Sequence, residues 1–132
     1  MQLSNFLRTV LKLDAASCLG MAALVLPTAA ALEAPLGIES AVLTAAAASL
    51  VPIGLFNLWL GMRREAVPAL VWLVILGNFG WTAASLAAVE ALPGITGLGQ
   101  AVVAGQGLAV MALALAEWTG LRASQSAGPQ RI

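Results

Sequence analysis

Four long apolar stretches, separated by short breaks, constrain the fold of this chain more than any other feature. They cover residues 11–32, 41–62, 66–92 and 98–121. A helix that crosses the hydrocarbon core of a bilayer needs about 20 mostly apolar residues, and each stretch is long enough. The breaks contain helix-ending or charged residues: Pro35, Gly37, Arg63, Arg64, Glu65, Pro93 and Gly94. The pattern predicts an all-α integral membrane four-helix bundle in a single domain, residues 1–122, followed by a polar tail, residues 123–132.

The composition excludes most other classes of protein. Of 132 residues, 61% are hydrophobic and only 9% are charged, whereas a soluble domain has about 25% charged residues. The lipid bilayer is therefore the expected partner, and a net charge of zero offers nothing for nucleic acid. The chain has one cysteine, Cys18, and no histidine, so it lacks the commonest ligands of zinc and haem and the commonest general base. We expect no metal, no cofactor and no catalytic activity.

The positions of the basic residues predict the orientation. With four spans, all six lie on one side of the membrane: Arg8, Lys12, Arg63, Arg64, Arg122 and Arg131. The other side has Glu33, Glu39 and Glu90 and no basic residue. Short cytoplasmic loops are rich in lysine and arginine. We therefore expect a multi-pass protein of the bacterial inner membrane with both termini in the cytoplasm.

The N-terminal segment allows two interpretations. Residues 2–12 are amphipathic, so they could lie in the membrane interface. Alternatively, the first helix begins early with Ser4 as its N-cap, and we favour this second interpretation. Arg8 and Lys12 before an apolar run also suggest a cleaved signal peptide. Asp14 and Pro27 interrupt that run, so we expect the segment to be retained.

Each predicted span has one polar stripe at helical spacing. In lipid, helices associate through small residues and interhelical hydrogen bonds, so residues spaced by three or four positions indicate the inward face. Four facing stripes make a bundle. The stripes are Asp14, Ser17, Cys18 and Met21; Leu50, Ile53, Gly54, Asn57 and Gly61; Asn78, Trp81, Thr82 and Ser85; and Gly99, Val103, Gln106, Val110, Leu113 and Glu117.

Two polar groups are candidate sites. Asn78 and Gln106 lie near the middle of neighbouring antiparallel spans, so we predict an intramembrane hydrogen bond between them, direct or through water. The second group is a polar cluster near the cytoplasmic side: Asp14, Asn57, Glu117, Lys12, Arg63, Arg64 and Arg122. We favour a salt-bridged structural collar, in which nearby cations keep the carboxylates ionised. A pocket for a lipid headgroup and a proton or ion relay are the alternatives.

Three segments resemble short four-span inner-membrane proteins of proteobacteria that have no assigned activity. They are LRTVLKLDAASCLG (7–20), VILGNFGWTAASL (74–86) and ALAEWTGLR (114–122). The resemblance covers the whole chain and implies a topology but no chemistry.

Two functions fit the sequence. We favour an accessory or scaffolding component of a membrane complex, acting with a protein partner or as a homo-oligomer, and expect its bundle to be dry and filled. The alternative is a small oligomeric transporter or channel for an ion or a small hydrophobic solute, with a water-filled path reaching Asn78. A bound lipid fits either function.

Overall fold

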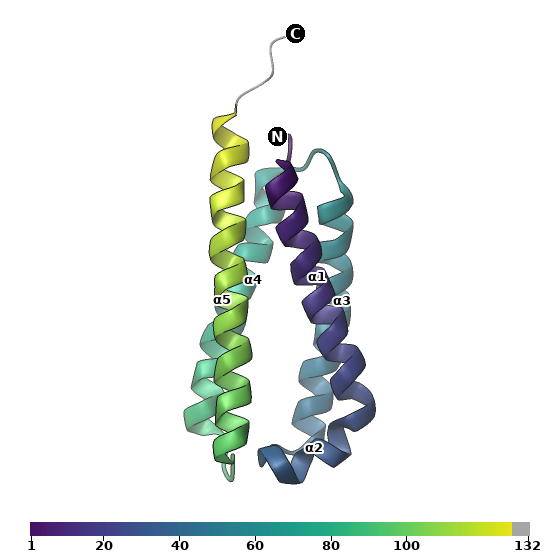
Figure 1. The fold of residues 1–132 in the computed structure, drawn as a ribbon, viewed down its shortest axis with the longest axis vertical. Coiled ribbons are helices and arrows are strands. Elements are labelled where there is room, and N and C mark those ends of the chain that lie inside the picture. The colour runs from purple at the N-terminus through teal and green to yellow at the C-terminus, as the bar shows by residue number, and fades with distance from the viewer. Residues whose placement is uncertain (128–132) are drawn as a thin grey trace.

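Four long helices, each apolar enough to cross a membrane, pack as a bundle within residues 1–127, the part of the chain that the computed structural model describes (Figure 1). In chain order the elements are α1 (Asn5–Val25), a 3-10 turn η1 (Leu26–Thr28), α2 (Ala29–Leu36), α3 (Ser40–Met62), α4 (Pro68–Ala91) and α5 (Gly97–Ser126). The first crossing segment combines α1, η1 and α2. The prediction of an all-α membrane bundle is confirmed, and the chain is a multi-pass membrane protein.

The first helix begins earlier than residue 11, as the interpretation with a Ser4 cap predicts. The Ser4 hydroxyl accepts a hydrogen bond from the backbone N–H of Leu7 at 3.1 Å, which satisfies one free donor of the first turn. Residues before the helix are also held, because Leu3 N–H donates to the Arg64 carbonyl and Ser4 N–H donates to the Ser124 hydroxyl. The N-terminal segment is therefore continuous with the bundle.

The helices are arranged as two antiparallel pairs, α1 with α3 and α4 with α5 (Figure 1). Glycines allow the helices of each pair to approach closely, as small residues do in membrane proteins. A side chain at Gly54 would collide with Leu19 across the α1–α3 contact, and one at Gly107 would collide with Ser85 across the α4–α5 contact. We refer to these two pairs as the first and second hairpins.

The two hairpins are joined at both ends of the bundle. At the end with the N-terminus, apolar side chains from α1, α3, α4, α5 and the segment before α1 form a core. Its members are Leu3, Leu7, Leu11, Leu60, Val71, Val74, Ile75 and Leu121. At the opposite end, α2 turns towards α5 (Figure 1). It ends at Gly37, whose φ of 66° is the left-handed conformation that favours glycine. The N–H of Thr96, the residue before α5, donates to the Leu36 carbonyl at the end of α2 at 3.1 Å, and this bond links the two hairpins.

Candidate functional site

Four polar side chains, one from each long helix, meet inside the bundle. The Asn78 amide nitrogen on α4 donates to Asp14 Oδ2 on α1 at 2.7 Å and to Glu117 Oε2 on α5 at 3.0 Å. Asn57 on α3 donates to the same Asp14 oxygen at 2.9 Å. The Cys18 thiol donates to the other oxygen, Oδ1, at 3.6 Å. We call Asp14, Asn57, Asn78 and Glu117 the acid–amide cluster.

The cluster is almost completely buried within the bundle. Asp14 and Glu117 are 0% exposed, and Asn57 and Asn78 are 2% and 6% exposed. A carboxylate can be buried only where donors compensate for the lost water. For Asp14, the amides of Asn57 and Asn78 supply those donors. Glu117 is less well supplied, because its Oε1 has no hydrogen-bond partner among residues 1–127.

The basic residues of the predicted collar do not join this cluster. Lys12, Arg63, Arg64 and Arg122 are exposed, and neither carboxyl group pairs with a cation within the described part of the chain. Arg63 lies over the Trp59 ring at 5.1 Å and Arg122 over the Trp118 ring at 6.0 Å. The prediction of a salt-bridged collar is therefore wrong for these contacts, although Asp14, Asn57 and Glu117 do come together.

Helix length places the two carboxyl groups deeper in the bundle than the sequence predicts. Asp14 is nine residues beyond the first residue of α1, and Glu117 is nine residues before the last residue of α5. Nine residues span about 14 Å of helix. Because both helices extend beyond the predicted spans at this end, the two acids move deeper. They reach the level of Asn78, which lies near the middle of α4.

The prediction of a direct Asn78–Gln106 hydrogen bond is wrong, and a bond through water stays a prediction. Gln106 Oε1 accepts from the indole N–H of Trp81 at 2.9 Å, and its amide nitrogen donates to the Ser85 hydroxyl and the Val103 carbonyl, each at 2.8 Å. Both hydrogens of each amide nitrogen are thus used elsewhere. Gln106 still joins α4 to α5, but through Trp81 and Ser85, which lie one and two helical turns from Asn78.

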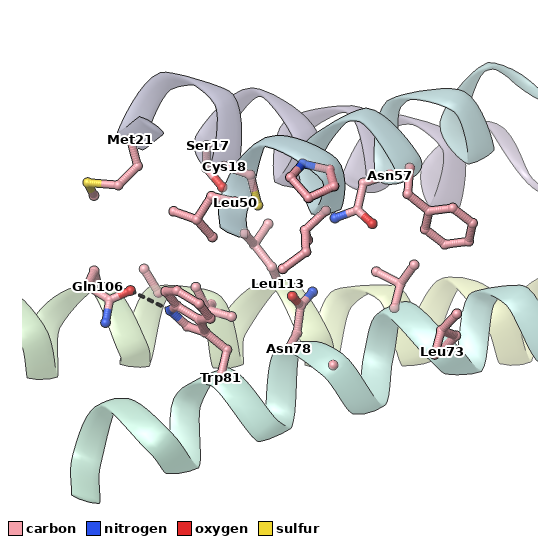
Figure 2. A pocket seen from close by; sticks show the side chains of 17 residues that line it. Ser17, Cys18, Met21, Leu50, Asn57, Leu73, Asn78, Trp81, Gln106 and Leu113 are labelled. Carbon is pink, nitrogen blue, oxygen red and sulfur yellow. Dashed lines mark hydrogen bonds between the residues drawn. The ribbon is translucent and has the colours of Figure 1, made fainter. Parts of the chain in front are cut away.

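A cavity of about 490 Å³ lies between the two hairpins, alongside the acid–amide cluster. All four long helices contribute to its wall, which is mostly apolar. Figure 2 shows Asn57 and Asn78 reaching into it from opposite sides, with the Trp81–Gln106 pair further along. The full lining is Ser17, Cys18, Met21, Leu50, Pro52, Ile53, Phe56, Asn57, Leu73, Val74, Gly77, Asn78, Trp81, Gln106, Ala109, Val110 and Leu113.

Part of the cavity wall lies at the outer surface of the helices. Its wall includes Ile53 on α3 and Leu73 on α4, which are 39% and 60% exposed. The backbones of these two helices approach each other closely at few places. In a membrane the exposed side chains of Ile53 and Leu73 would face the acyl chains.

The predicted polar stripes mostly face inward, and the exceptions border the cavity. Asp14, Cys18, Asn57, Asn78, Thr82, Ser85 and Glu117 are buried. Ser17 and Ile53 are exposed but line the cavity. Sequence reasoning missed the thiol contact of Cys18 with Asp14, for which the spacing of four residues on one helix was the available signal.

Comparisons with protein-family models, curated proteins and solved structures found no match to this chain.

Proposed function

We propose that this protein binds a small hydrophobic molecule inside its bundle and takes it up sideways from the bilayer, as a carrier for a hydrophobic solute. The observation that carries the proposal is the apolar cavity of about 490 Å³ beside the acid–amide cluster. Cavities that hold small ligands measure about 300–1,000 Å³ and combine apolar walls with a few polar groups. Both conditions are met here.

The cavity favours this role over an accessory or scaffolding role. A scaffold needs only a filled bundle and an outer surface for its partner, whereas a carrier needs internal space. The space reaches Asn78, which is where a transport path was expected. We propose no chemical reaction at this site, because the chain has no histidine and the acids and amides of the cluster are hydrogen-bonded to one another.

We also propose an inner-membrane location with both termini in the cytoplasm. The start of α1 and the end of α5 lie at the same end of the bundle, together with the α3–α4 connection (Figure 1). Arg8, Lys12, Arg63, Arg64 and Arg122 belong to these segments. A one-sided distribution of arginine and lysine supports a cytoplasmic position for that end.

Binding in the cavity can be tested with two ten-carbon probes, decanol and decylammonium, each carrying a hydrogen-bond donor on an apolar tail. Radiolabelled probe would be dialysed against the protein in phosphatidylcholine nanodiscs, with empty nanodiscs as the blank. The blocking variant is Gly77→Leu, because Gly77 lines the cavity and a Cβ there meets nothing within 4 Å. The matched control is Gly80→Leu, on the same helix, equally unobstructed and outside the cavity lining.

The expected result is probe binding above the blank by the wild type and by Gly80→Leu, and a loss of that excess in Gly77→Leu. If neither probe binds the wild type above the blank, the carrier proposal fails and the scaffolding role is favoured. If Gly77→Leu binds as well as the wild type, the probe occupies another place and the cavity is not the site.

A further inference from the structure

The polar groups that the cavity offers to a ligand are hydrogen-bond acceptors. Asn57 and Asn78 each turn the amide nitrogen towards Asp14. A planar amide that points its nitrogen at an acid directs its oxygen elsewhere. Neither amide oxygen accepts a hydrogen bond from any residue between 1 and 127, and both side chains line the cavity (Figure 2). Two nearly buried acceptors without donors therefore face the same apolar space.

The groups behind these amides carry negative charge. Asp14 and Glu117 both accept from Asn78 Nδ2, so their oxygens are separated by less than the sum of the two bond lengths, 2.7 and 3.0 Å. Asp14 accepts hydrogen bonds from the Asn57 and Asn78 amides and from the Cys18 thiol, and it donates none among the described residues. An ionised carboxyl group only accepts hydrogen bonds, and this pattern fits a carboxylate. No cation contacts either acid among the described residues.

The unpaired amide oxygens and the acids behind them together indicate which kind of ligand the cavity favours. Each of the two amide nitrogens donates a hydrogen bond to Asp14. This bond polarises the amide group and makes its oxygen a stronger hydrogen-bond acceptor. The amide oxygens of Asn57 and Asn78 are therefore the places in the cavity where a positively charged donor is best stabilised. Hydrogen bonds from a cation are about twice as strong as those between neutral groups.

We infer that the cavity takes a lipophilic ammonium ion with at least one N–H group, whose head binds the amide oxygens of Asn57 and Asn78 while its apolar tail fills the space towards Trp81. This inference rests on the proposed function and specifies the ligand class. The Asp14–Glu117 pair supplies the countercharge without touching the ligand. An anion of the same length is repelled by the pair, and a quaternary ammonium ion has charge but no N–H.

The test compares four probes of one chain length in the nanodisc assay: decylammonium, decyltrimethylammonium, decanol and decanoate. We expect the wild type to bind decylammonium about tenfold or more tightly than decanol, since a charge-assisted hydrogen bond exceeds a neutral one by roughly 1.4 kcal/mol, a factor of ten. Decyltrimethylammonium should bind more weakly than decylammonium. Decanoate should remain at the blank.

Two variants separate the charge of the acid pair from general attraction to an acidic protein. Glu117→Gln keeps the size of the side chain and removes one acid, and the double variant Asp14→Asn with Glu117→Gln removes both acids. The matched control is Glu90→Gln, which removes an exposed acid at the far end of α4. The double variant should bind decylammonium and decanol equally, and Glu90→Gln should keep the wild-type preference.

Each result decides between the claims. Equal binding of decanol and decylammonium by the wild type overturns the ammonium inference and leaves the carrier proposal standing. A preference that survives in the double variant also overturns it, because the countercharge would then come from elsewhere. If the double variant does not fold, the four-probe series on the wild type decides the matter, because equal binding of decanol and decylammonium there overturns the inference. Failure of every probe to exceed the blank removes both proposals.

Discussion

Replacing Asn78 by leucine is the most informative change to the bundle, because one amide nitrogen serves two buried acids. The substitution removes the 2.7 Å bond to Asp14 and the 3.0 Å bond to Glu117. Asp14 keeps its donor from Asn57. Glu117 keeps none among residues 1–127, because its other oxygen already has no hydrogen-bond partner. The substitution should therefore weaken mainly the packing of α5, the helix that carries Glu117.

The size of the effect follows from these two bonds. Interhelical hydrogen bonds in membranes are worth about 0.6 kcal/mol on average and up to about 1.7, whereas bonds to charged groups in soluble proteins are worth about 1.5–3 kcal/mol. Both acids are 0% exposed, so neither water nor lipid replaces the lost donors directly. We expect Asn78→Leu to lower the free energy of unfolding by about 2–3 kcal/mol, near the upper membrane value for two bonds. Asn78→Gln retains an amide and should be milder.

The assay is equilibrium unfolding in mixed micelles of dodecyl maltoside and sodium dodecyl sulfate, followed by far-ultraviolet circular dichroism. Gln100→Leu is the control, because Gln100 is an exposed amide on α5 and its replacement should have little effect. The reasoning is refuted if Asn78→Leu lies within about 0.5 kcal/mol of the wild type, the range typical of surface substitutions.

Three further predictions concern other parts of the bundle. A periplasm-active reporter should be active when inserted between α4 and α5 and inactive when fused after α5; the reverse pattern would contradict the proposed orientation. Trp81→Phe removes the N–H that Gln106 accepts and should cost about 1 kcal/mol in the same unfolding assay, and an unchanged stability would show that this bond contributes nothing. Gly99→Ala should strongly lower the melting temperature, because its Cβ would collide with the Leu36 carbonyl oxygen. The control Gly20→Ala should melt like the wild type, because a Cβ there meets nothing within 4 Å. Similar melting temperatures of the two variants would exclude close α2–α5 packing.

The helical class and the inward faces could be predicted from the sequence because they depend on local properties. The length of each apolar stretch decides whether a helix can cross the membrane. The spacing of Asp14, Asn57, Asn78 and Glu117 among apolar neighbours decides which side of each helix avoids lipid. These properties do not depend on the other helices. They can therefore be predicted for each span separately.

The partners of the polar groups could not be predicted in the same way. Whether Asn78 meets Gln106 or Asp14 depends on the relative depth of three helices, and an error of a few residues at a helix end changes it. The start of α1 depends on the Ser4 cap and on the bond from Leu3 N–H to the Arg64 carbonyl, which joins segments far apart in the sequence. The cavity depends on how the two hairpins pack against each other at their ends, and no local sequence pattern predicts that packing.

The distribution of the acid–amide cluster over the two hairpins has a consequence for membrane insertion. The first hairpin contains Asp14 and Asn57, already joined by a hydrogen bond, and the second contains Asn78 and Glu117, joined in the same way. Each hairpin can thus leave the insertion machinery with its own acid bonded to its own amide, which lowers the cost of carrying that acid into lipid. The bond from Asn78 to Asp14 is the one that requires both hairpins. Insertion of the chain as two helical pairs, followed by their docking at this bond, therefore avoids any stage at which a single acid enters the bilayer alone.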